Sequence, residues 1–185
     1  MPLKAQRTAR IHYQRYIFCV FGKGNLTSNV GAAGVLGLVP IQVQVPLIVD
    51  RLGHCATAVA ANSQVKGGIY RDNGDLPDGA ALICQTAAEL EVAGKNELAI
   101  PDTLLMPGLY WAGIEWDRAG STYLRSATPY QTIGTLIPHY FVVPGGFAAD
   151  LPTPCPVTLT TNTFPSTFLR VKAVKPVTDR MEVLA

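Results

Sequence analysis

The densest group of side chains that could bind a metal ion lies in one short loop, residues 72–79. It contains three carboxylates and an amide, from Asp72, Asn73, Asp75 and Asp78. Hard cations such as Ca²⁺ take oxygen ligands of this kind, although the early glycine and the missing final glutamate depart from the EF-hand pattern. Asp, Asn, Gly and Pro are also the residues that consecutive turns require. We predict a structural loop, with a cation site as the alternative.

A second group of candidates lies at the end of the aromatic segment 109–116. With a period of two, Tyr110 and Ile114 share one face, which we expect to pack in the core. Glu115 lies on the other face and suggests that this face is partly wet, although Leu109 and Trp111 on the same face argue the opposite. Trp116 is followed by Asp117 and Arg118. An aromatic ring beside charged groups suits a sugar ring or a neighbouring subunit, so these three residues form a candidate ligand or subunit contact.

The sequence shows no arrangement typical of an enzyme. There is no G-x-S-x-G segment, and the histidines are not spaced as metal ligands. We predict a non-enzymatic protein without a cofactor, in which the histidines are packed or on the surface. The histidines are His12, His54 and His139. The cysteines form no C-x-x-C pair, and we expect reduced thiols. They are Cys19, Cys55, Cys84 and Cys155.

The first residues of the chain are basic. Lys4, Arg7, Arg10 and Arg15 come before the first acidic residue, Asp50. Such an arm could be a solvated tail, a contact to phosphates, or a docking arm on an acidic partner. A net charge of +2 is too small to steer the whole protein to nucleic acid, so we expect no nucleic-acid partner. We expect the arm to dock on a partner protein.

The bulk composition points to one domain that associates with other proteins. Of the 185 residues, 48% are apolar and only 15% are charged, so we expect part of the apolar surface to be covered by other subunits. No apolar segment is long enough for a membrane span, and residues 17–21 are too short for a signal sequence. We therefore expect synthesis in the cytoplasm and no membrane partner.

Short segments rich in branched and aromatic residues, separated by Gly and Pro, predict an all-β protein. The predicted strands are 13–21, 36–45, 48–60, 65–71, 80–87, 95–100, 109–116, 122–126, 132–143 and 167–174. Their number and spacing favour an antiparallel β-sandwich or jelly roll with an extended N-terminal arm. We place the arm and strand entry at residues 1–35 and the sandwich at residues 36–185. Segments 66–79 and 107–116 are expected to form its centre.

Two strings within the sandwich resemble a known family. Gly68-Ile69-Tyr70-Arg71-Asp72-Asn73-Gly74-Asp75-Leu76-Pro77 and Pro107-Gly108-Leu109-Tyr110-Trp111-Ala112 resemble a β-sandwich domain of tailed-bacteriophage structural proteins, found in head decoration (cement) proteins and fibre tips. The similarity covers roughly residues 36–175. It implies a virion surface component that assembles in the host cytoplasm, forms a homotrimer and carries no catalytic residues.

The position on the virion follows from two further features. Fibres usually carry a stalk of heptads or repeats, which this chain lacks, and the basic arm could lie on a capsid lattice. The expectation is therefore a trimeric decoration protein bound to the major capsid protein or another virion protein. The alternatives are a tail-fibre or receptor-binding domain that recognises host glycan, and a carbohydrate-binding module.

Overall fold

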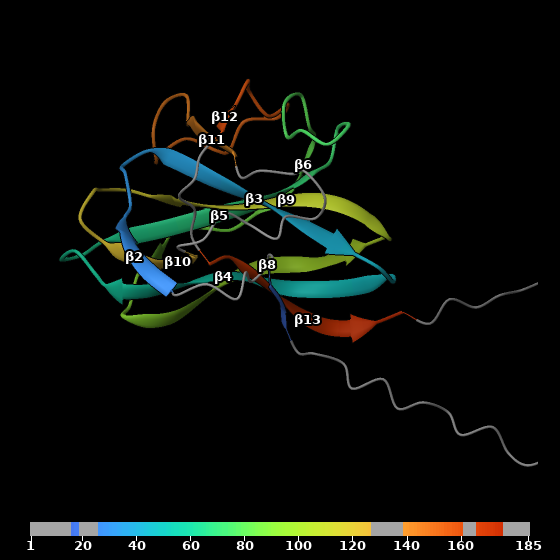
Figure 1. Ribbon diagram of the computed structural model, residues 1–185, viewed down its shortest axis with the longest axis horizontal. Helices are drawn as coiled ribbons and strands as arrows, with labels where there is room; N and C mark the ends of the chain where they lie inside the picture. The colour runs from blue at the N-terminus through green and yellow to red at the C-terminus, as the bar shows by residue number, and fades with distance from the viewer. Residues whose placement is uncertain (1–15, 19–25, 127–138, 161–165, 176–185) are drawn as a thin grey trace, which may run out of the picture.

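The computed structural model describes residues 16–18, 26–126, 139–160 and 166–175, which form two antiparallel β-sheets with no helix in these ranges (Figure 1). The first sheet has the order β1 (Tyr16–Phe18), β13 (Phe168–Val174), β4 (Leu47–Ala58), β10 (Thr122–Ser126) and β2 (Leu26–Val30), and β8 (Gly94–Leu105) also pairs with β4. The second has the order β12 (Leu159–Thr160), β11 (His139–Val142), β3 (Val35–Val43), β9 (Gly108–Trp116), β5 (Gln64–Arg71) and β6 (Leu82–Gln85), and β7 (Glu89–Leu90) also pairs with β5. This arrangement confirms the predicted all-β sandwich. The described residues include no helix long and apolar enough to cross a membrane.

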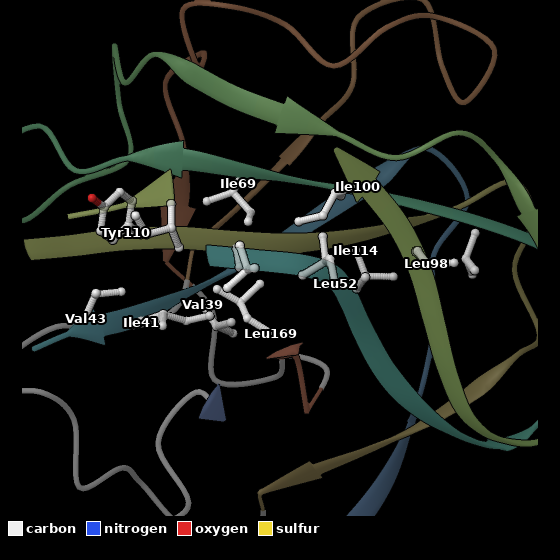
Figure 2. Close-up of a cluster of buried hydrophobic side chains, with 14 of the residues drawn as sticks. Val39, Ile41, Val43, Leu52, Ile69, Leu98, Ile100, Tyr110, Ile114 and Leu169 are labelled. Carbon is white, nitrogen blue, oxygen red and sulfur yellow. The ribbon is translucent and has the colours of Figure 1, made fainter. Parts of the chain in front are cut away.

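The main core lies between the two sheets. Alternate residues of β9 point into it, including Tyr110 and Ile114, as the period of two predicts. They meet Leu52 of β4, Leu98 of β8 and other buried side chains from the facing sheet (Figure 2). Burial of these apolar side chains is the main favourable contribution to the stability of the fold.

A second core covers the outer face of the seven-stranded sheet. Trp111 of β9 and Tyr70 of β5 are fully buried there, beneath Leu151 and Cys155 of the segment that follows β11. The covering segments are hydrogen-bonded to each other, because the Gly79 amide donates to the Cys155 carbonyl and the Cys155 amide to the Ala80 carbonyl. Both faces of β9 are therefore buried.

The two segments expected at the centre are neighbours. Strand β5 pairs with β9 from Val65 opposite Trp116 to Arg71 opposite Tyr110. On the other side of β9 lies β3, in a register that places Leu36 opposite Glu115. The sequence prediction of this central pair is confirmed, and it fixes where the loop at residues 72–79 leaves the sheet.

Two prolines lie inside strands rather than at their ends. Pro40 is opposite Trp111 in β3, an internal strand, and the described pairing of β3 with β11 covers Val35 to Leu38. Pro101 lies in β8 beside a shift in the register between β8 and β4, near Asp50. Strand β8 continues past this irregularity to Leu105, whereas the sequence predicted that it would end at Ile100.

The segment predicted as arm and strand entry, residues 1–35, contains two described strands. Strand β2, residues 26–30, pairs with β10, and β1 pairs with β13, so both belong to the first sheet. Residues 1–15 and 127–138, which include the basic arm and part of the predicted strand 132–143, lie outside the described residues.

Replacement of Gly67 by alanine tests the close contact of the two central strands. A Cβ at Gly67 would lie 2.4 Å from the Gly113 carbonyl oxygen and 2.7 Å from a methyl carbon of Leu52. Since the nearer atom is backbone, Gly67→Ala should lower the free energy of unfolding by about 1–3 kcal/mol. Urea unfolding measures this, with the exposed Leu90→Ala as the control expected to change it by under about 0.5 kcal/mol. Equal stability of the two variants would contradict the close packing.

Candidate functional site

The carboxylates of the loop at residues 72–79 hold the loop itself. Asp72 accepts hydrogen bonds from the Trp111 indole N–H at 2.8 Å and from the Asp75 amide at 3.0 Å. The Asn73 side chain donates to the Asp78 carbonyl at 2.9 Å. Asp75 has a φ of 68°, and Gly74 precedes it at 75°, a conformation typical of such turns. These contacts support the predicted structural loop.

Asp78 links the loop to the covering segment. Its Oδ1 accepts hydrogen bonds from the amide and from the hydroxyl of Thr158. The Thr158 hydroxyl is also 2.7 Å from Nδ1 of His139, whose ring meets the Trp111 ring edge-on at 5.2 Å. Asp72 and Asp78 therefore hold the two ends of one chain of contacts that closes over the outer face of the sheet.

The alternative of a cation site gains no support from this geometry. Among the described residues, no three His, Cys, Asp or Glu side chains come together as ligands. Two of the three loop carboxylates are occupied by donors from the protein.

The three described cysteines, Cys55, Cys84 and Cys155, are free, and burial raises the pKa of the Cys155 thiol to about 12.

The candidate contact at Trp116, Asp117 and Arg118 divides into a core residue and a turn. Trp116 is only 3% exposed, so its ring cannot stack against a ligand at the surface, and the prediction of a ligand contact is wrong for this residue. The Asp117 carboxylate accepts from the Gln64 amide at 2.9 Å and from the Arg118 guanidinium. Arg118 also donates to the Ala61 carbonyl. Asp117 and Arg118 thus fix the turn between β4 and β5.

The Trp116 ring belongs to a buried polar cluster that the sequence did not indicate. Its indole N–H donates to Glu91 Oε1 at 3.0 Å, and His54 Nε2 lies 2.8 Å from the same oxygen. Burial raises the pKa of Glu91, but hydrogen bonds from His54, Ser121 and Trp116 outweigh this and leave it lowered. His54 is completely buried, so the cluster joins β4, β9 and the segment after β7 from inside.

A second buried charge pair holds the covering segment. Lys66 of β5 lies opposite Glu115 of β9, with 3.3 Å between Nζ and Oε2, and Glu115 is fully buried. The expectation of a partly wet face at Glu115 is therefore wrong. Lys66 Nζ also donates to the carbonyls of Phe147 and Ala149. Burial raises the pKa of Glu115 despite the nearby ammonium of Lys66. Lys66, paired with Glu115, thus binds residues 147–149 to the sheet.

Strand β1 begins, and strand β13 ends, at the same end of the first sheet. Strand β13 ends at Val174, opposite Leu47 at the start of β4. Strand β1 runs antiparallel to β13, with Tyr16 opposite Arg170, so the start of β1 lies at the end of the sheet where β13 finishes. In Figure 1 the arrowheads of β13 and β3 point to the same side. The predicted arm residues Lys4, Arg7, Arg10 and Arg15 lie outside the described residues.

No family model, curated protein or solved structure matches this chain.

The contact between His139 and Thr158 predicts a pH-dependent stability. Burial lowers the pKa of His139 below its ordinary value, against a smaller opposing effect of Asp78. As the pH falls, His139 is therefore protonated in the unfolded chain before it is protonated in the folded protein. The folded state keeps its full stability above about pH 6.5 and loses part of it as the pH falls through the lower pKa of the folded state. His139→Gln should make the melting temperature depend less steeply on pH below about 6.5. An unchanged slope in thermal unfolding would contradict the assignment.

Proposed function

We propose that the protein is a non-enzymatic structural component of a bacteriophage virion, a trimeric decoration protein that ties neighbouring capsid subunits together at the virion surface. The observation that carries the proposal is that the start of β1 and the end of β13, adjacent strands of one sheet, lie at the same end of the sandwich. A sandwich attached in this way can stand on a shell with both segments toward it. The resemblance of residues 68–77 and 107–112 to phage sandwich domains supports the same function.

The mechanism is mechanical. Residues 1–15 carry four basic side chains and no acidic one, and in a trimer three such arms reach three places on the shell. Linked weak contacts bind far more tightly than one contact alone, provided that the arms can reach their sites simultaneously. The sandwich then serves as a rigid knob from which the arms extend.

The flank of the sandwich offers a surface for the trimer. Strand β12 is the edge of the seven-stranded sheet and pairs only with β11 among the described strands. Val142 of β11, Leu159 of β12 and Val157, which lies just before β12, are between 61% and 81% exposed. Leu159 lies opposite Tyr140, two residues from Val142, so the two exposed side chains share a face. Subunits joined side by side through this edge would point all chain ends in one direction.

Removal of the arm tests the decoration function. The full chain should cosediment with shells of its own phage that have been stripped of this protein, and should raise their melting temperature. A variant without residues 1–12 should keep the folded trimer and lose at least about tenfold in apparent affinity, because the multivalent contact is lost. Binding to host cells without binding to shells would favour the receptor-binding alternative. Equal shell occupancy by the two proteins would refute the role of the arm.

Charge at the flank tests the trimer. The double variant Val142→Asp with Leu159→Asp would place carboxylates in every subunit contact of the proposed trimer, where apolar side chains are buried. Burying these charges is costly, so the protein should become monomeric at micromolar concentration while it stays folded. Light scattering after gel filtration gives the mass, and circular dichroism checks the fold. Leu90→Asp, an exposed position on β7, is the matched control and should remain trimeric. A trimer that survives the double substitution would exclude this surface.

A further inference from the structure

The loop at residues 72–79 contains Asn73 and Gly74, and no other asparagine of the sequence is followed by a glycine. A five-membered ring can close between the Gly74 amide nitrogen and the side-chain carbon Cγ of Asn73, because only the carbonyl carbon, Cα and Cβ of Asn73 separate them. Glycine leaves its own nitrogen unhindered, since it carries no Cβ. The pair is therefore the position in the chain where this ring closes most readily.

The folded loop leaves the Gly74 amide available for this reaction. The Asn73 amide donates to the Leu76 carbonyl at 3.1 Å, and the Asp75 amide donates to the Asp72 carboxylate at 3.0 Å. Among the described residues, the Gly74 amide has no such partner. Gly74 is exposed, and nothing lies within 4 Å of a Cβ built on it. Water and hydroxide therefore reach the nitrogen that must lose its proton.

Two other asparagines occupy positions that oppose the same reaction. The amide that follows Asn62, that of Ser63, donates to the Ala60 carbonyl at 3.0 Å, and Ser63 is buried. Asn96 is buried too, and its side chain is held by hydrogen bonds with the amide and the carbonyl of Val92. Both are followed by residues that carry a Cβ. They are references within the same chain.

We propose that Asn73 is a site of spontaneous covalent modification in the folded protein, and that its conversion to a carboxylate releases the loop from the Asp78 carbonyl. The Gly74 nitrogen loses its proton to hydroxide and forms a bond to Cγ of Asn73. The bond between Cγ and Nδ2 then breaks, and Nδ2 takes up a proton from water and leaves as ammonia. Water opens the cyclic imide. Opening at Cγ leaves an aspartate, and opening at the backbone carbonyl carbon leaves an isoaspartyl link. The net reaction consumes one water and releases one ammonia, without an oxidant or a reductant.

The conversion removes a contact that holds the loop. The Asn73 side chain donates from Nδ2 to the Asp78 carbonyl oxygen at 2.9 Å, and a carboxylate has no proton to donate there. A negatively charged oxygen would instead face the carbonyl oxygen. Residues 72–79 already carry three carboxylates and no basic side chain, so a fourth adds repulsion between like charges. Asp78 also accepts hydrogen bonds from Thr158, so the loop loosens where it holds the covering segment.

Peptide mapping by mass spectrometry tests the reaction on the full chain, kept folded at mildly alkaline pH. The peptide that contains Asn73 should gain about 1 Da with time, and the peptides that contain Asn62 and Asn96 should not. Asn73→Gln should abolish the gain, which assigns it to this residue. The chain unfolded in urea shows the reactivity without the fold. A gain in urea but none in the folded protein would overturn the proposal, and so would the absence of a gain in both.

Thermal unfolding tests the consequence. Asn73→Asp reproduces the first product and should melt about 2–4 °C below the wild type, because it loses the donor to Asp78 and adds a charge to the loop. The matched control is Asn62→Asp, which adds the same charge at an exposed position in another turn and should melt within about 1 °C of the wild type. Equal melting of Asn73→Asp and the wild type would refute the release of the loop. Neither measurement involves shells, so the outcome is independent of the proposed function.

Discussion

The burial of both faces of β9 is the constraint on which the rest of the molecule depends. One face of this strand meets the other sheet and carries Tyr110 and Ile114, and the other carries Trp111 and Glu115. A sheet with two apolar faces needs a cover on each side. The facing sheet supplies one cover, and the segments 72–81 and 143–158 supply the other without regular strands for most of their length. The sandwich is therefore effectively three layers thick at its centre.

The irregular cover is held by polar groups rather than by a ladder. Lys66 ties down the carbonyls of Phe147 and Ala149, and Asp78 ties down Thr158. Each contact satisfies backbone groups that a loop without secondary structure would otherwise leave unpaired. Buried charges are costly unless they are paired, so each also favours one position of the loop over its alternatives. The polar residues of this face thus define the shape of the cover.

The sequence predicted what alternation and turn residues encode. Residues 167–174 alternate in their second half, and residues 109–116 are rich in aromatic side chains; both are strands of the structure. The turn residues of the loop at 72–79 indicated its structural role. The cover at 143–158 has no period, because its residues are placed by individual hydrogen bonds to distant partners. The prediction for Glu115 was wrong for the same reason. A single carboxylate in a strand indicates a solvent-exposed face unless its partner on the neighbouring strand, here Lys66, is known.

The buried pair of His54 and Glu91 had no local signal at all, since the two residues are far apart in sequence and neither lies in a motif. The one hint was the aromatic strand itself, whose last ring needs a hydrogen-bond acceptor when it is buried. Trp116 was instead assigned to the surface because Asp117 and Arg118 follow it. The charges of that turn are satisfied by the backbone of residues 61 and 64, and the ring turns inward.

The pairing of β4 with β13 has a consequence for the order in which the protein can fold. Strand β4 begins at Leu47, and its partner across the ladder is Val174, far along the chain. During synthesis this edge of β4 cannot pair with β13 until all the strands between them have been made. Ladders between such distant segments close slowly, and unpaired edges invite aggregation while they last. A nascent chain that stops before β13 would leave one edge of β4 largely open.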